Sequence, residues 1–321
     1  MNIIVYEDEL YKNFLPLTWT RPVWDLRCGA TTILERIKRK YWGSDIIFKG
    51  REPLVKDPGE KIDGQRVNGR ILAITSREIR YPWDLVINLR QDLDEDLKYM
   101  GKKISGWLHP TVALYNQENM LIEEGAEIEA FAVLDARSGP IYIGKKTIIR
   151  PHAHIRGPVS IGPDCRIGGE VQHSIIHGNS NKGHYGFLGH SYVGEWVNLG
   201  AGTTNSNLKN NFGSVKMLAD GKEIDTREQF LGCVIADHAK LGIGTLIPTG
   251  AIIGVSANLF SGGMIPKLVP SFTWGIKDEY KLDKAIECIA AVMRRRGREL
   301  SYEDKSLLQA VFEGTAAERR G

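Results

Sequence analysis

Aliphatic residues recur at every sixth position through the middle of the chain. One run of five extends from Ile143 to Ile167, and a second extends from Ile235 to Leu259. This period fits neither an α-helix, with about 3.6 residues per turn, nor a strand with alternating side chains. It predicts a three-sided coil of short strands, each with one inward aliphatic side chain and with small residues or glycine at corners of positive φ. Stacked coils bury a continuous column, so we expect a mainly β fold with a left-handed parallel β-helix over residues 106–275.

The six-residue phase fails in two segments. From Gly168 to Phe187 the register slips, and from Leu208 to Gln229 the chain is polar and out of phase. Insertions in a solenoid usually form protruding loops, often on the working face. The sequence therefore predicts functional loops at both places.

The N-terminal flank has a different pattern. A strand-like start at Ile3–Val5 precedes a helical stretch around Thr31–Lys40 and a second strand-like run at Asp84–Leu89. Such alternation is typical of α/β units, and we expect residues 1–105 to form a small α/β domain of this kind.

The C-terminal flank shows helical periodicity. Apolar spacing predicts a helix over Asp278–Arg296 that ends at Gly297, and Ser301 offers the N-cap of a second helix reaching about Ala317. We expect residues 276–321 to form a helical hairpin that covers the end of the solenoid and hides its strand edge.

Charge and composition exclude several classes of function. The chain has 42 Lys plus Arg against 39 Asp plus Glu, and a net charge of +3 gives no basic footprint for nucleic acid or an anionic membrane. Its four cysteines form no CxxC pair, no apolar run reaches 18 residues, and the first residues carry acids where a signal peptide needs bases. We expect a cytoplasmic protein that acts on small molecules and binds neither nucleic acid nor membrane.

All eight histidines lie between His109 and His238, mostly in the irregular part of the coil. Histidines on neighbouring coils can converge on zinc, and a single histidine near neutral pKa can act as a general base. Most of them are expected to be ordinary surface residues. His184 differs because it lies in the segment NSNKGHYGFLGHSYVGEWVNLGAGTTNSNLKNN.

This segment resembles the acetyltransferase half of the bifunctional N-acetylglucosamine-1-phosphate uridyltransferase/glucosamine-1-phosphate acetyltransferase family. The family motif is a small-residue segment with Lys and Gly that leads to His, then Asn-x-Gly-Ala-Gly-Thr and a further Asn. FLPLTWTRPVWDLRCG, GGEVQHSIIHGNSNKGHYGFLG, GVSANLFSGG and PSFTWG are similar to a narrower, sugar nucleotidyltransferase-like branch. The resemblance spans nearly the whole chain.

The resemblance implies an acetyl-CoA-dependent N-acetyltransferase that acts on an amino sugar or amino-sugar phosphate in nucleotide-sugar metabolism. It makes His184 the general base that takes a proton from the sugar amine as the amine attacks the thioester. It also implies that Asn207 orients the amine and that Asn198 lines the sugar pocket. Acyl transfer further needs a positioned thioester and donors for the developing oxyanion.

Other roles also come only from the resemblance. Arg156 stands where the family has a phosphate-binding arginine, whereas Gln172 replaces a phosphate-binding lysine. Ala201, Ile243 and Ser261 occupy positions where backbone groups hold the acyl-CoA arm. Relatives assemble as trimers with the site between subunits, so a homotrimer is expected.

Two family tyrosines fall at Phe187 and Leu208, which leaves the acceptor and its phosphate open. Lys182 or Lys209 is a candidate to replace the missing lysine, and we place Lys182 among the expected substrate-binding residues.

The N-terminal region departs further from the family. Sugar nucleotidyltransferases open with a Gly-rich loop and a Pro-Lys pair, but TRPVWDLRCG offers only Arg21, Arg27 and Gly29 in about half the usual length. We interpret this motif as helix entry or domain packing and predict that nucleotidyl transfer, with its Mg²⁺ requirement, is absent.

Three alternatives stay open at this point. They are sugar-1-phosphate nucleotidyl transfer of the UDP- or dTDP-sugar pyrophosphorylase kind, a metal-dependent hydratase of the γ-carbonic anhydrase type, and a non-catalytic sugar-nucleotide-binding scaffold. No metal ligand set is predicted. His184 together with both asparagines favours acyl transfer over a scaffold.

Overall fold

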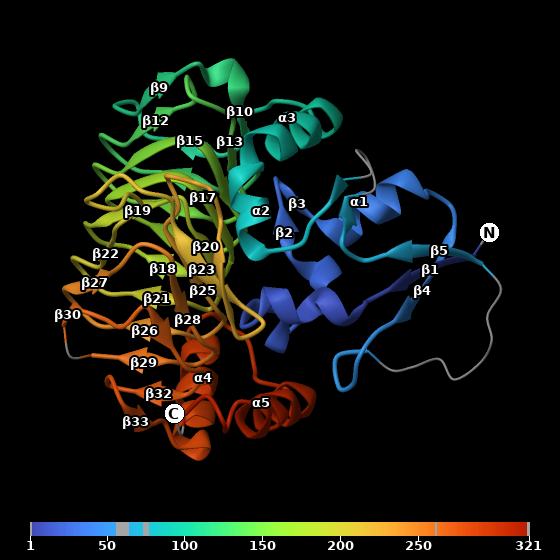
Figure 1. The fold of residues 1–321 in the computed structure, drawn as a ribbon. Coiled ribbons are helices and arrows are strands. Elements are labelled where there is room, and N and C mark those ends of the chain that lie inside the picture. The colour runs from blue at the N-terminus through green and yellow to red at the C-terminus, as the bar shows by residue number, and fades with distance from the viewer. Residues whose placement is uncertain (1, 56–63, 73–76, 261, 320–321) are drawn as a thin grey trace.

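A computed structural model describes residues 2–55, 64–72, 77–260 and 262–319, and shows a β-solenoid of about nine turns between residues 107 and 274 (Figure 1). A small α/β domain lies against one side of the solenoid, and two helices follow its last coil. The predicted fold class is confirmed.

The N-terminal domain is built on a three-stranded parallel sheet in the order β4 (Asp45–Lys49), β1 (Asn2–Tyr6) and β5 (Gln65–Asn68). Its first helix, α1 (Ile33–Lys40), begins where Thr32 and Glu35 cap each other's backbone N–H groups at 3.2 and 2.7 Å. Short elements connect these: η1 (Glu9–Phe14), η2 (Leu17–Trp19), η3 (Val23–Asp25), and the hairpins β2 (Arg27–Cys28) with β3 (Thr31–Thr32) and β6 (Ile71–Leu72) with β7 (Arg77–Glu78).

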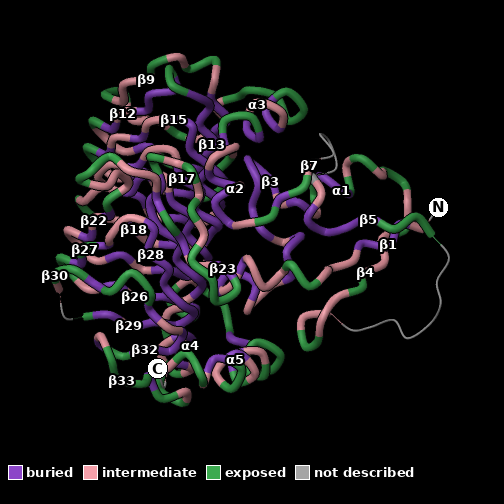
Figure 2. The backbone as a smooth tube through the Cα atoms, viewed as in Figure 1, coloured by how far each residue is buried: buried purple, intermediate pink, exposed green. Residues whose placement is uncertain are grey.

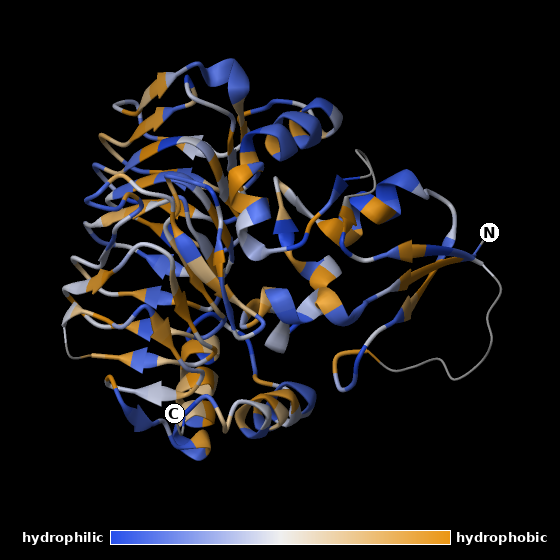
Figure 3. Ribbon diagram, in the orientation of Figure 1, coloured by the Kyte–Doolittle hydropathy of each residue, from blue (hydrophilic) through white to orange (hydrophobic). Residues whose placement is uncertain are grey.

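The predicted strand at Asp84–Leu89 is wrong, because this segment is helical. It forms α2 (Pro82–Ile87) and the start of α3 (Leu89–Met100). Pro82 takes the first helical position, and the Asp84 carboxylate accepts the backbone N–H of Tyr81 at 3.0 Å. Both helices bury an apolar side against the solenoid, and α3 is two-coloured in Figure 3, with hydrophobic and hydrophilic faces.

The solenoid has three faces, here called A, B and C. Face A, which the N-terminal domain covers, contains β10 (Met120–Ile122), β13 (Ile141–Ile143), the second halves of β15 (His154–Ile161) and β17 (Glu170–Gly178), β20 (Tyr192–Glu195), β25 (Cys233–Ile235), β28 (Ala251–Ile253) and β31 (Leu268–Val269). Face B contains β8 (Trp107–Leu108), β11 (Glu127–Ile128), β14 (Ile148–Ile149), β16 (Arg166–Ile167), β18 (Asn181–Lys182), β21 (Asn198–Leu199), β26 (Lys240–Leu241), β29 (Asn258–Leu259) and β32 (Thr273–Trp274), with antiparallel β33 (Asp278–Glu279) at its end. Face C contains β9 (Ala113–Tyr115), β12 (Val133–Asp135), the first halves of β15 and β17, β19 (Phe187–Gly189), β22 (Thr204–Asn205), β27 (Thr245–Ile247) and β30 (Gly263–Met264), and the short η4 (Gln117–Asn119) leads into β10.

The periodic aliphatic residues form the core of the solenoid. Both predicted runs, Ile143 to Ile167 and Ile235 to Leu259, are at most 2% exposed at every sixth position. Figure 2 shows this buried column inside the coils. The hexapeptide pattern therefore marks the inward positions, as the sequence predicts.

The corners differ from the prediction, because many residues with positive φ there are not glycine. Asp164, Asn179 and His238 are examples, with φ of 57°, 54° and 62°. Each donates its backbone N–H to a carbonyl of the preceding coil, at 2.9 Å in all three cases. This bond between coils holds the left-handed conformation, so a glycine is not required.

Neither irregular segment is simply a protruding loop. The first continues the faces as β17, β18 and β19, with a shortened coil. The second contains the hairpin β23 (Lys216–Ala219) and β24 (Lys222–Asp225). Val215 and Met217 are buried in the hydrophobic cluster between the N-terminal domain and face A, so this insertion helps to join the two domains.

The C-terminal helices are α4 (Leu282–Arg294) and α5 (Tyr302–Gly314), with Ser301 as the predicted N-cap of α5 at 3.0 Å from the Asp304 N–H. They pack on the solenoid corner formed by Trp196, Val255 and Phe272, and so extend along several coils. No helix in the described part of the chain is long and apolar enough to cross a bilayer.

Candidate functional site

His184 lies in the turn between β18 and β19, at the edge where face B passes into face C. Its side chain is exposed, and among the described residues its imidazole has no hydrogen-bond partner. The ring is therefore free for contact with a ligand, as a general base must be.

Lys182 holds this turn from inside the solenoid. It occupies an inward position that aliphatic residues fill in the neighbouring coils, and its Nζ donates to the carbonyls of Gly168, His184 and Gly186 at 2.7, 3.2 and 2.7 Å. Burial lowers the pKa of Lys182 to about 8. All three N–H donors of the Lys182 ammonium are therefore bonded to backbone carbonyls of the chain. In this structure the Lys182 side chain therefore points into the solenoid and holds the turn that carries His184, and its expected role in substrate binding stays a prediction.

The next coils continue the edge that begins at His184. Gly202 N–H donates to the Tyr185 carbonyl at 3.0 Å, and Gly244 N–H donates to the Ala201 carbonyl at 2.8 Å. Ala201 and Ile243 therefore follow the histidine turn along one corner, and Ile243 is 76% exposed. Ser261, the third residue expected to hold the acyl-CoA arm, lies outside the described residues.

Asn198 lies on face B, around the corner from face C. Its Oδ1 accepts a hydrogen bond from Asn181 Nδ2 at 2.8 Å, which forms a short asparagine ladder between coils. Asn198 is half-buried and adjoins the strand that leads into the His184 turn.

Arg156 and Asn207 belong to the opposite edge of face C. Arg156 donates to Gln172 Oε1 on the next coil and lies 3.9 Å from Glu170. Asn207 Nδ2 donates to Nδ1 of His190 at 2.8 Å, so its amide is already engaged in this structure. Arg156 pairs with Gln172 on the next coil, whereas Asn207 bonds to His190 two coils further along. The structure therefore places neither residue at the His184 edge of face C.

The sequence reasoning missed part of this edge. His173 and His190 stack with ring centroids 4.5 Å apart, and both line a pocket of about 310 Å³ beside Arg156. Arg90, from α3 of the N-terminal domain, lines the same pocket. The clustering of histidines in the sequence was the only signal that could have indicated His173 and His190. No feature of the sequence pointed to Arg90.

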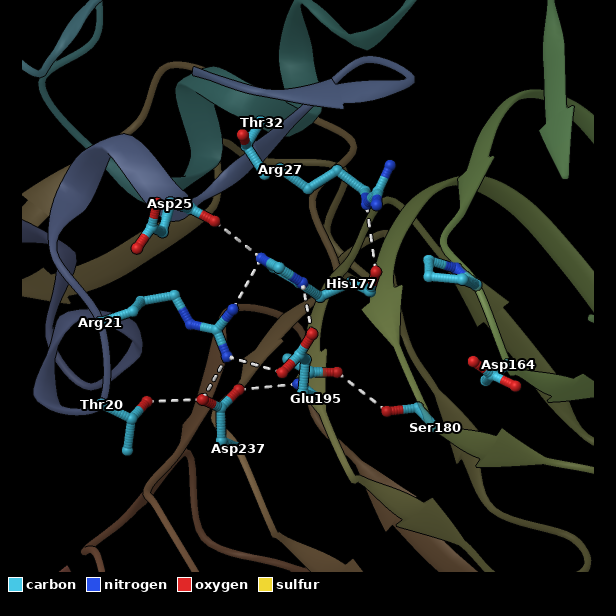
Figure 4. A network of polar contacts seen from close by, with 12 residues as sticks. Thr20, Arg21, Asp25, Arg27, Thr32, Asp164, His177, Ser180, Glu195 and Asp237 are labelled. Atoms are coloured by element: carbon cyan, nitrogen blue, oxygen red, sulfur yellow. Dashed lines mark hydrogen bonds and ion pairs between the residues drawn. The ribbon is translucent and has the colours of Figure 1, made fainter. Parts of the chain in front are cut away.

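The motif TRPVWDLRCG docks the N-terminal domain on the solenoid (Figure 4). Arg21 bonds to Asp237 and to His177 Nε2 at 2.7 Å, and lies 3.6 Å from Glu195. Arg27 donates through Nε to the His177 carbonyl at 3.1 Å. These contacts support the interpretation of the motif as domain packing.

The carboxyl edge of the N-terminal parallel sheet is the usual place for a nucleotide in an α/β fold. Two arginines near this edge are engaged within the chain. Arg70 bonds to Asp8 and Glu78 at 2.5 and 2.8 Å, and Arg51 bonds to Glu7 at 2.8 Å. A phosphate would have to displace these carboxylates.

The described residues contain no group of three or more His, Cys, Asp or Glu side chains placed to hold a metal ion. Apart from the stacked pair His173 and His190, the histidines have separate surroundings, such as His152 stacked on Phe131 at 5.2 Å and His177 at 3.2 Å from Glu195.

Comparison with known proteins divides the chain in the same way. Residues 3–77 match the sugar nucleotidyl transferase family, and residues 140–172 match the bacterial transferase hexapeptide repeats. A bifunctional protein GlmU from Picosynechococcus is 31% identical over 47% of this chain and 29% of its own length. A bifunctional sugar-1-phosphate nucleotidylyltransferase/acetyltransferase from Sulfurisphaera tokodaii is 34% identical over 46% of this chain and 36% of its own length.

A bifunctional protein GlmU from Methanococcus vannielii is 26% identical over 87% of this chain and 64% of its own length. The chain thus spans less than two thirds of each of these curated relatives. Among solved structures, a hexapeptide transferase family protein from Anaplasma phagocytophilum is 15% identical over 68% of this chain and 93% of its own, with a TM-score of 0.21. The acetyltransferase domain of PglB from Neisseria gonorrhoeae in complex with acetyl coenzyme A is 13% identical over 82% of this chain and 95% of its own, with a TM-score of 0.15. The chain combines a sugar nucleotidyl transferase segment with hexapeptide repeats and is distantly homologous to the bifunctional enzymes.

Proposed function

We propose that the solenoid catalyses acetyl-CoA-dependent N-acetylation of an amino sugar or amino-sugar phosphate. The observation that carries this proposal is that face C has a free imidazole, His184, at one edge and a cation-lined pocket with Arg156 at the other. An amino-sugar phosphate carries an amine and an anion on one molecule. It can therefore lie across the face with its amine toward the histidine.

In this reaction His184 takes a proton from the sugar ammonium or from the amine as nitrogen attacks the thioester carbonyl. The C–N bond forms, the C–S bond breaks, and the CoA thiolate leaves and is protonated. Lys182 and the turn fix the ring, while Ala201 and Ile243 present a rigid edge to the pantetheine arm. A solenoid edge suits this task because its backbone does not reorganise during reaction.

A second copy of the chain completes the site in our proposal, as in the expected homotrimer. The His184 edge and the last coils of face C carry exposed apolar side chains, which are Tyr185, Ile243, Leu246, Phe260 and Met264. A concentration of exposed apolar residues of this kind marks a protein or ligand contact surface. CoA would lie in the seam between two such surfaces.

The N-terminal unit takes no part in nucleotidyl transfer in this proposal, although its sequence matches that family. Arg51 and Arg70 are engaged by carboxylates at the sheet edge, and Arg21 and Arg27 hold the domain on the solenoid. The arginines nearest that edge are therefore already paired with the chain's own carboxylates.

Free-thiol release from acetyl-CoA, measured with a panel of amino sugars and amino-sugar phosphates, tests the proposal. We expect turnover with at least one phosphorylated or nucleotide-linked amino sugar, together with an N-acetylated product by mass spectrometry. Pyrophosphate exchange with UTP, dTTP and sugar phosphates in Mg²⁺ is expected to stay at background. Pyrophosphate exchange without acetyl transfer would show that the chain is a nucleotidyltransferase and not an acetyltransferase.

A further inference from the structure

The pocket beside Arg156 is formed by two domains. Helix α3 of the N-terminal domain packs on β15 and β17 and contributes Arg90. The solenoid contributes the remaining walls, which are Ser138, Arg156, Gly157, Pro158, Gln172, His173 and His190. At about 310 Å³ the pocket is at the lower end of the range for small-molecule sites.

Both guanidinium groups of this pocket keep donors for a ligand. Arg90 is 4.0 Å from Asp94 and its side chain is 67% exposed, whereas Arg156 is 3.9 Å from Glu170 and 42% exposed. Ion pairs of this length and exposure bind weakly. Because arginine stays charged at all working pH values and has five N–H donors, the pair forms a positive site with unused hydrogen-bonding capacity.

His190 adds a neutral donor whose tautomer is set by its neighbour. An amide nitrogen can only donate, so Asn207 Nδ2 must give its hydrogen to His190 Nδ1, 2.8 Å away. Burial, with His173 and Arg156 nearby, lowers the pKa of His190 to about 3, so the ring is neutral and has its one proton on Nε2. Among the described residues no acceptor bonds to that Nε2–H.

His173 fixes the position of this ring. Its Nε2 donates to the Val86 carbonyl of α2 at 2.9 Å, and its ring stacks on His190. His190 also stacks on Phe230, with ring centroids 5.6 Å apart. The N-terminal domain therefore holds the floor of the pocket as well as supplying one of its cations.

We propose that Arg90 and His190 complete a binding site for the phosphoryl group of the acceptor, with Arg90 providing the second positive charge that Gln172 cannot. The assignment of the ligand as an acceptor rests on the proposed acetyl transfer, but the anion site itself does not. The N-terminal domain thereby becomes part of the acceptor pocket. It supplies the positive charge of Arg90 and one wall of the pocket.

Titration calorimetry on the full chain tests this site with glucosamine 1-phosphate, inorganic phosphate, glucosamine and UDP-N-acetylglucosamine. We expect the wild type to bind the phosphorylated probes and not glucosamine. Arg90→Gln is expected to weaken glucosamine 1-phosphate binding about 10-fold or more, and His190→Phe, which keeps the stack but removes the donor, by a smaller factor. Arg80→Gln is the matched control, because Arg80 is 69% exposed and lies outside the pocket, and it should bind as the wild type does.

The outcomes separate the two proposals. Wild-type affinity in Arg90→Gln, or no binding of any phosphorylated probe by the wild type, overturns the phosphoryl site. Phosphate binding that depends on Arg90, without acetyl transfer to any amino sugar, supports the site and removes the proposed function. Tighter binding of the UDP-sugar than of the monophosphate, lost in Arg90→Gln, supports the site with a diphosphate as its ligand.

Discussion

Replacing His184 by asparagine is expected to lower kcat for acetyl transfer by about 10²–10⁴-fold, the usual contribution of a positioned general base. The change should leave stability nearly unaltered, since the side chain is exposed and has no partner among the described residues. Steady-state kinetics and thermal unfolding on the same preparation measure both quantities.

His152→Asn is the matched control for this substitution. His152 is also an exposed histidine at a solenoid corner, and asparagine tolerates its φ of 60°. We expect this variant to retain turnover. If His184→Asn retains turnover as well, His184 is not the base.

Replacing Arg21 by methionine is expected to lower the free energy of unfolding by about 3–5 kcal/mol, because it leaves the buried Asp237 carboxylate without its cation. Asp237 is almost fully buried and bonds to Arg21, and Glu195 lies 3.6 Å from the same guanidinium. Urea unfolding followed by fluorescence measures the change. Adding Asp237→Asn to the variant should restore part of the loss, since one of the unpaired charges is then removed.

The pH dependence of stability gives a second readout of this network. Burial alone would raise the pKa of Glu195, but His177 and Arg21 outweigh it and hold the pKa below its ordinary value. At Asp237, too, burial would raise the pKa, but the charge of Arg21 outweighs it and the pKa is lowered. Carboxylates with lowered pKa stabilise the fold above their ordinary values of 4.5 and 3.8 and lose that contribution as pH falls.

The difference in stability between wild type and Arg21→Met should therefore narrow below about pH 4.5. Without Arg21, burial favours the protonated form of these carboxyl groups. Lower pH therefore removes an unfavourable charge from the folded variant, whereas in the wild type it removes a favourable ion pair. A difference below about 1 kcal/mol at pH 7 would show that the network contributes little to domain docking.

Much of the fold follows from local patterns. The six-residue period marks Ile149, Ile167 and Leu241 as inward residues, and Ser301 marks the start of the last helix. Neighbouring coils contact one another in the order of the chain, so the period alone specifies the stacking. The error at Asp84–Leu89 has a local reason, because a short apolar run does not distinguish a buried helix from a strand.

The sequence by itself determined the solenoid, its aliphatic column and the motif around His184. Only the tertiary structure decided that the Lys182 ammonium bonds to backbone carbonyls inside a coil. It also decided that Arg21 bonds to Asp237, 216 residues away in the sequence, and that Arg90 lines the same pocket as His190. The physical reason is range. A repeat is stabilised by contacts with the adjacent coil, whereas charges and donors from separate domains come together only once both have folded and packed.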